Sequence, residues 1–381
     1  MVAAWAPERL VWLDNLKVLL IAAIIAIHGV LSYAGSVEVW SYTEYREVTL
    51  SPVTEGLLVV LVAPFGLFVI ALLFLVAGLL TPPAVHRSGA GAYVRGRLLR
   101  LGVPFVLFVL LVQPALMYAL ERPLGGASRS YWYEILGTER RLDTGPLWFV
   151  GVLLIFSLGY AGYTVVRRRR RSARPARPIT AGNLLAVLAV VAPASFLVRL
   201  VYPYGGESGF ADLNFWQWPA CLAVFALGIA ASGQGWLRAV PEPLRRRCRA
   251  VTLPALVAMA GLLLAAGLLD RVDDGRGGWN WWAAGFAGIE STLSVFGPVW
   301  LLAVAQRRLR RRLRWGPVLS RTAYGAFIVQ GVFLIGLAVA LRPVPLPAEA
   351  KALLVAGGGV AASFAVAWLL VSRIRGLARI L

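Results

Sequence analysis

About ten long apolar stretches run through the chain, and each is close to the length that a helix needs to cross a bilayer, roughly 20 residues for ~30 Å of hydrocarbon. The 381 residues are 59% apolar and have a mean hydropathy of +0.73, more than a soluble domain of this length carries. The sequence therefore predicts an all-α fold, a polytopic membrane protein. We expect the spans at roughly residues 11–33, 57–80, 101–120, 146–166, 183–203, 215–236, 251–269, 281–305, 322–341 and 352–371.

Basic residues give an independent view of the topology. The chain has 38 basic and 18 acidic residues, for a formal net charge of +20. With the N-terminus inside, the inner segments hold about 28 of the basic residues and the outer loops about 8, which is a strong positive-inside pattern. We therefore expect both termini in the cytoplasm and a multi-pass protein of the plasma membrane. A bias toward Ala, Gly and Arg is typical of a bacterium with GC-rich DNA.

The arginines gather in runs such as Arg167–Arg171 and Arg307–Arg314. Beside membrane helices, such runs are typical topology signals that also contact anionic lipids, and membrane lipids are therefore expected partners. A phosphate-binding role remains the alternative. No nucleic-acid-binding fold accompanies the runs, so we expect no nucleic-acid partner.

Nothing in the sequence indicates a separate soluble domain. The longest segments outside the membrane are about 20–25 residues, so residues 1–381 are expected to form a single membrane domain. Cys221 is at membrane depth and Cys248 is in an arginine-rich inner segment. Because the two cysteines are at different levels, we expect neither a disulfide nor a metal site.

Ionisable residues at membrane depth are few, and each is a candidate functional group. His28 is about five residues from the outer end of the first span, and imidazole transfers protons near neutral pH. Glu290 is about nine residues into the eighth span, roughly 13 Å deep. The two side chains are therefore expected at neighbouring depths, with Glu290 either orienting His28 or making a structural hydrogen bond to another helix. Ser32 shares a helix face with His28, a weak indication of a Ser/His pair.

On the inner side, Arg97 and Arg100 occur just before the third span, in the segment Arg95-Gly-Arg97-Leu-Leu-Arg100-Leu-Gly-Val-Pro104-Phe105. Residues three apart are neighbours on an α-helix, so the two guanidinium groups can bind phosphates jointly.

Five segments occur in an order that resembles a known family. They are Arg9-Leu10 with Leu13-Asp14-Asn15-Leu16-Lys17 and then His28, Phe74-Leu75-Val76-Ala77-Gly78-Leu79, Arg97-Leu-Leu-Arg100-Leu with Pro104-Phe105, Leu147-Trp148-Phe149-Val150, and Thr322-Ala-Tyr324-Gly325-Ala-Phe327. Together they resemble the integral-membrane acyltransferase type 3 proteins over nearly the whole chain. Three positions depart from that pattern: Lys17 replaces the usual Arg, Ala77 the usual Ser, and Gln330 a frequent second His. Lys17 keeps the charge but not the bidentate fork of arginine.

The resemblance implies transfer of an acyl group, usually acetyl, from cytoplasmic acyl-CoA to a hydroxyl of an extracytoplasmic or membrane-embedded acceptor such as a sugar, a glycolipid or a natural product. Eleven residues separate Lys17 from His28, ~16–17 Å along a helix, comparable to the reach of a pantetheine arm. Lys17, Arg97 and Arg100 are the expected binding residues for acyl-CoA, which is a co-substrate. No metal is expected.

His28 is expected to act as general base toward the acceptor hydroxyl or as a transient acyl carrier. Glu290 is the expected orienting residue, and Gln330 the expected hydrogen-bond donor to a developing oxyanion. Two other classes of function remain open: a lipid or polysaccharide flippase or exporter, because several prolines interrupt the spans, and a structural partner in the cell envelope. The acceptor, the acyl length and the oligomeric state do not follow from the sequence.

Overall fold

The computed structural model describes residues 10–36, 42–121, 143–167, 177–206 and 212–374. Arg9 and most of the run Arg167–Arg171 lie outside the described residues. Within the described ranges the secondary structure is helical, without strands, and ten helices are long and apolar enough to cross a membrane. The chain is therefore a multi-pass, all-α membrane protein, as its hydropathy predicts.

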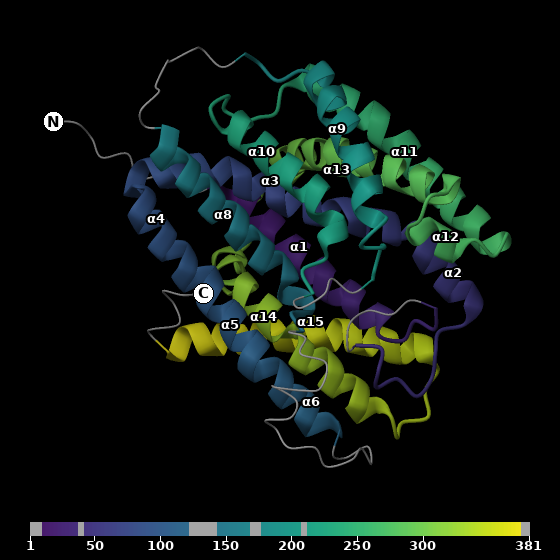
Figure 1. Ribbon diagram of the computed structural model, residues 1–381. Coiled ribbons are helices and arrows are strands. Elements are labelled where there is room, and N and C mark those ends of the chain that lie inside the picture. Colours follow the sequence, from purple (N-terminus) through teal and green to yellow (C-terminus); the bar gives the residue numbers. More distant parts are fainter. Residues whose placement is uncertain (1–9, 37–41, 122–142, 168–176, 207–211, 375–381) are drawn as a thin grey trace. The chain divides into compact units, whose positions relative to one another are not determined.

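Each predicted span corresponds to one helix or one run of helices (Figure 1). The elements are α1 (Val11–Leu31), α2 (Pro52–Leu61), α3 (Ala63–Ser88), α4 (Ala90–Arg97), the π-helical turn η1 (Leu98–Gly102), α5 (Val103–Leu107), the π-helical turn η2 (Phe108–Val112), α6 (Gln113–Glu121), α8 (Trp148–Arg167), α9 (Ala181–Arg199), α10 (Trp218–Ser232), α11 (Glu242–Leu268), the short α12 (Val272–Arg276), α13 (Trp281–Arg308), α14 (Gly316–Leu341) and α15 (Ala348–Arg373).

The helix ends differ from the hydropathy boundaries for identifiable reasons. The second span begins at Pro52, earlier than expected, because the Ser51 side chain caps the first turn by accepting from the Thr54 N–H. It is interrupted at Val62, two residues before Pro64, whose nitrogen carries no hydrogen to bond the preceding turn. Helix α11 begins at Glu242, because a charged segment continues the helix outside the apolar window.

The helices divide into two compact units. The smaller unit has residues 1–34, 42–49 and 301–381, and the larger has residues 35–41 and 50–300, so α13 contributes to both. The expectation of a single membrane domain stays a prediction.

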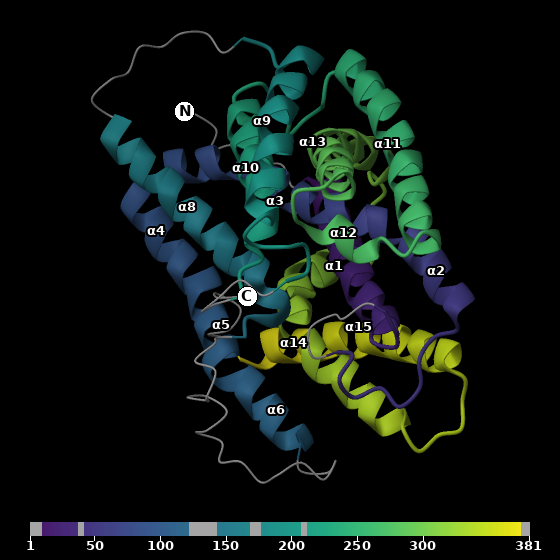
Figure 2. The same ribbon diagram turned by 45° about the vertical axis from the view of Figure 1, so that its right-hand side comes forward.

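In the smaller unit, α1, α14 and α15 lie side by side (Figures 1 and 2). Small residues allow the close approach: the backbone of Gly29 lies against Ala356, and Gly359 lies against Leu334. Small residues at helix contacts, such as Gly29 and Ala356, are typical of helix packing in membranes, where close backbone contact replaces the hydrophobic effect as the driving force.

The contacts of α1 also fix the direction of its neighbour. Lys17 is hydrogen-bonded to Ser320 of α14, and His28, later in α1, is hydrogen-bonded to Gln330, later in α14. The two helices therefore run parallel. Parallel helices require an even number of membrane crossings between their starts. That is the relation expected for the first and ninth of ten spans, and the tertiary contacts thus support the alternating topology.

In the larger unit, α3 and α10 cross at two glycines and lie side by side in both views (Figures 1 and 2). A Cβ atom at Gly78 would overlap the carbonyl oxygen of Phe225, and one at Gly228 would overlap that of Leu75. Both obstacles are backbone atoms, which do not move as a flexible side chain does. Gly78, within the Phe74–Leu79 segment noted above, is therefore required by packing.

We expect Gly78→Ala to destabilise the protein by about 1–3 kcal/mol, because overpacking must displace the α10 backbone. The measurement is the melting temperature of the purified protein in detergent. Gly261→Ala is the matched control, since no described atom lies within 4 Å of a Cβ there and alanine favours helix more than glycine does. Equal melting temperatures for the two variants would contradict the packing role of Gly78.

Candidate active site

His28 makes a defined hydrogen bond within the smaller unit. Its Nδ1 lies 3.0 Å from Oε1 of Gln330 on α14. The Gln330 amide nitrogen donates to the Phe327 carbonyl oxygen, also at 3.0 Å, so the amide oxygen is the atom that faces the imidazole. Because that oxygen only accepts, Nδ1 carries the proton and Nε2 presents its lone pair. This is the tautomer that a general base or a nucleophile requires.

Tyr42 holds the imidazole from a second direction. The two ring centroids are 5.2 Å apart and the planes are tilted by 32°. Tyr42 is buried, whereas His28 is half-buried. The ring is thus fixed both by a hydrogen bond at Nδ1 and by packing against an aromatic face. Sequence reasoning did not single out Tyr42, because tyrosine near a helix end is usually part of the interfacial belt.

The segment that carries Tyr42 is tied to α15 by an ion pair. Lys351, only 2% exposed in the first turn of α15, donates to the Glu47 carboxylate. Tyr33, five residues after His28 in the chain, is buried. Its hydroxyl has no hydrogen-bond partner among the described residues. Burial, reinforced by the negative charge of Glu47, raises the pKa of Tyr33 to about 12. The ion pair between Lys351 and Glu47 was not predicted from the sequence. The rarity of lysine, with Lys17 as the one other in the chain, could have indicated that Lys351 has a specific role.

At the opposite end of α1, Lys17 donates from Nζ to the Ser320 carbonyl at 2.7 Å. The Ser320 hydroxyl in turn donates to Asp14 at 2.6 Å. Asn15, which the sequence did not single out, is buried and donates to two carbonyls beyond α13, those of Leu309 and Arg311. The three polar residues of the first motif therefore bind the chain around the start of α14.

Lys17 and His28 are on the same side of α1. Their separation of eleven residues is close to three full turns, or ~16–17 Å along the helix axis. The helix thus aligns a cationic group and an imidazole at the spacing that the sequence predicts.

Arg97 and Arg100 lie in the larger unit and differ in environment. Arg97 donates from Nε to the Tyr93 hydroxyl at 2.9 Å, and its guanidinium carbon is 5.1 Å from the Tyr93 ring centroid. Arg100 is exposed, within the π-helical turn η1. That turn begins directly after Arg97 and widens the helix between the two residues; such turns are frequent at functional sites. Their joint binding of phosphates stays a prediction.

Glu290 forms a buried ion pair with Arg199 in the larger unit. The rings of Tyr204, Trp216 and Phe286 surround the guanidinium group, with its central carbon 5.4, 5.5 and 5.3 Å from their centroids. The carboxylate thus has the structural partner on another helix that was the alternative to orienting His28. Because His28 belongs to the other unit, its pairing with Glu290 stays a prediction.

Ser32 does not support a Ser/His pair, because its hydroxyl donates to the Gly29 carbonyl at 2.8 Å. Cys221 and Cys248 are both buried free thiols. In the described parts of the chain, no group of three or more His, Cys, Asp or Glu side chains gathers closely enough to hold a metal ion. The chemistry that the described residues of the smaller unit offer is thus that of a positioned imidazole.

The sequence of the chain matches a known family. Residues 10–372, nearly the whole chain, match the family model described as an acyltransferase domain. No curated protein and no solved structure matches the chain. The matched range includes the motif of α1, the imidazole and its partner on α14. The chain therefore belongs to the acyltransferase type 3 family and is a membrane acyltransferase.

Proposed function

We propose that this protein transfers an acyl group, in the first instance acetyl, from cytoplasmic acyl-CoA to a hydroxyl group of an extracytoplasmic or membrane-embedded acceptor such as a sugar, a glycolipid or a natural product. It does so in a bacterial plasma membrane, with both termini in the cytoplasm. The observation that carries the proposal is the contact between His28 Nδ1 and Gln330 Oε1. It leaves Nε2 as the basic atom of an imidazole at membrane depth.

In the direct mechanism, Nε2 of His28 removes the proton of the acceptor hydroxyl while the oxygen attacks the thioester carbonyl. The carbon–sulfur bond then breaks, and the CoA thiolate takes the proton from the imidazolium ion. Gln330 Oε1 stabilises the imidazolium through the Nδ1–H bond throughout. In the stepwise alternative, Nε2 attacks the thioester and CoA leaves as a thiolate. The acceptor hydroxyl then takes the acyl group from the acyl-imidazolium ion, and its proton passes to the CoA thiolate.

Gln330 is better suited to orient His28 than to bind an oxyanion. An oxyanion site needs an N–H donor, and one of the two amide hydrogens of Gln330 is bonded to the Phe327 carbonyl oxygen. Its oxygen, which cannot stabilise negative charge, is the atom directed at the active residue. We therefore propose a positioning role for Gln330 as the alternative to the expected oxyanion role.

The donor and its side of entry are tested with membrane vesicles. Radiolabelled acetyl-CoA, which does not cross membranes, is added to inverted vesicles and to right-side-out vesicles that contain the protein and its native acceptors. We expect label to enter a hydroxylamine-sensitive ester only in inverted vesicles. Label in neither preparation, with unmodified lipid or glycan moved across the membrane, would favour the flippase or exporter instead. Label in right-side-out vesicles only would reverse the orientation.

The binding end is tested by Arg97→Gln with Arg100→Gln. Loss of two charge-assisted hydrogen-bond donors should raise the KM for acetyl-CoA by about tenfold or more, while the KM for the acceptor stays the same. The measurement is initial rate against each substrate in turn. An unchanged KM for acetyl-CoA would reduce both arginines to topology signals.

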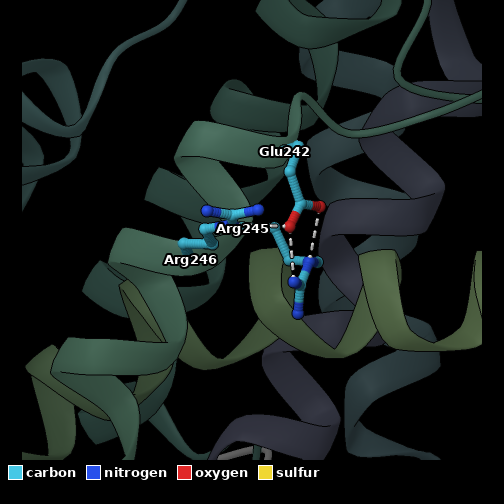
Figure 3. A network of polar contacts seen from close by, with 3 residues as sticks. All are labelled: Glu242, Arg245 and Arg246. Atoms are coloured by element: carbon cyan, nitrogen blue, oxygen red, sulfur yellow. Dashed lines mark hydrogen bonds and ion pairs between the residues drawn. The ribbon is translucent and has the colours of Figure 1, made fainter.

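A control for the loss of charge comes from α11. There, Glu242 accepts from Arg245 at 2.6 and 2.8 Å and from Arg246 at 2.9 Å (Figure 3). Arg247 and Arg249 are exposed and lie outside this network. Arg247→Gln with Arg249→Gln therefore removes the same charge from the same expected side and should leave both KM values unchanged.

A further inference from the structure

We propose that the linker 309–315, between α13 and α14, forms the phosphate-binding surface for the donor, with Arg311 and Arg312 as the binding residues beside Lys17. This inference rests on the proposed use of acyl-CoA and extends it to a segment whose run of arginines was expected to be a topology signal.

The linker and its flanks are strongly and one-sidedly charged. Between residues 301 and 323 there are seven arginines and no aspartate or glutamate. On the neighbouring stretch of α1, Lys17 adds a positive charge and Asp14 is the one carboxylate, bonded to the Ser320 hydroxyl. The arginines of α11 differ, because Glu242 pairs with two of them (Figure 3). A surface with this excess of guanidinium groups favours a polyanion.

Asn15 holds the backbone of the linker in place. Its amide nitrogen donates to the Leu309 carbonyl at 2.8 Å and to the Arg311 carbonyl at 2.9 Å. Both amide hydrogens are thus used on one short segment, by a side chain that is only 9% exposed. A topology signal acts through its charge and does not require a fixed backbone. A binding surface does require one, because ordered donors lose less entropy when the ligand binds.

The arginine side chains of the linker fall into two groups: two contact other parts of the chain, and two are exposed. Arg310 folds back and donates to the Gln306 carbonyl at 2.5 Å, and Arg314 lies over the ring of Trp315, at 5.6 Å. Arg311 and Arg312 are exposed. Planar guanidinium groups on an anchored backbone suit bidentate binding of phosphate oxygens.

The position of the linker fits the donor. Asn15 is two residues from Lys17, so the linker contacts the end of α1 that is ~16–17 Å from His28. Phosphates bound there would leave the pantetheine arm to extend along α1 toward Nε2. Anionic lipid headgroups share the phosphate chemistry, but CoA carries a diphosphate and a phosphomonoester, which match a dense cluster of arginines better than the single phosphate of a lipid.

The test measures binding without turnover. Wild type, Arg311→Gln with Arg312→Gln, and the control Arg247→Gln with Arg249→Gln are placed in nanodiscs of phosphatidylcholine alone. Their affinities for CoA, dephospho-CoA and pantetheine are measured by titration calorimetry. We expect the linker variant to bind CoA about tenfold to a hundredfold more weakly, to bind pantetheine as wild type does, and the control to match wild type throughout.

A second variant separates position from charge. Asn15→Ala leaves every arginine in place but releases the linker, and should also weaken CoA binding while its pantetheine affinity is unchanged. Loss of pantetheine affinity in either variant would indicate general damage to the site and contradict the assignment.

Glycerophosphoglycerol, the soluble headgroup of phosphatidylglycerol, is titrated into the same nanodiscs to distinguish the lipid source. If the linker variant lost affinity for this headgroup yet bound CoA as wild type does, the linker would be a lipid contact and the inference would be wrong. If wild-type protein bound no CoA at all, the donor in the proposed function would fail as well. Wild-type binding with unchanged affinity in both linker variants would overturn this inference alone.

Discussion

Replacement of His28 by alanine should lower the rate of acyl transfer by about 10²–10⁴-fold, because the reaction loses its general base. Expression and melting temperature should stay near those of the wild type, since His28 is half-buried and its partner Gln330 keeps its bond to Phe327. The measurement is kcat with saturating acetyl-CoA, together with thermal unfolding of the same preparation.

His28→Gln provides the matched control for structure. Glutamine keeps a hydrogen bond to Gln330 but does not carry a proton near neutral pH, so its activity should be nearly as low as that of alanine. A purely structural histidine would behave in the opposite way: glutamine would restore function, and alanine would destabilise the fold. Acyl transfer at the wild-type rate in His28→Ala would exclude the mechanism proposed above.

The second large effect is expected at Gln330. Gln330→Leu removes the acceptor of the Nδ1–H bond and leaves that donor of the half-buried His28 unpaired, a loss of about 1–3 kcal/mol. If that loss falls on the transition state, kcat should drop about five- to 150-fold, with the KM for acetyl-CoA unchanged. The measurement is the separate determination of kcat and KM.

Gln330→Glu decides between the two roles considered for this residue. Glutamate retains an oxygen that accepts from Nδ1–H but has no amide donor. A positioning role predicts that Gln330→Glu is more active than Gln330→Leu. An oxyanion role predicts that Gln330→Glu is at least as impaired, because negative charge would face the developing oxyanion.

Hydropathy was sufficient to predict the ten spans, because a bilayer requires long apolar helices and little else. It did not predict where the helices end. Glu242 starts α11 within a charged segment, and the break at Val62 depends on Pro64. Those boundaries are set by capping and by lost backbone hydrogen bonds, which an apolar average does not include.

The site was predictable only in part, for a similar reason. Rarity of ionisable groups identified His28, and the motif of the first span identified Lys17. Their partners were not predictable, since Gln330 is 302 residues from His28 in the chain. Asn15 and Lys351 also act through distant segments, and one sequence contains no record of which segments meet. Glu290 shows the same gap, because depth alone did not identify Arg199 as its partner.

The two hydrogen bonds between α1 and α14 fix the number of residues between their two ends. Lys17 with Ser320 marks one end, and His28 with Gln330 marks the other. Exchange of one apolar residue for another between Lys17 and His28 changes neither hydrogen bond. Insertion of a single residue would turn His28 by about 100° and advance it by about 1.5 Å relative to Lys17. The two hydrogen bonds to α14 could then no longer form at the same time. The segment between Lys17 and His28 can thus vary in amino-acid identity but not in length.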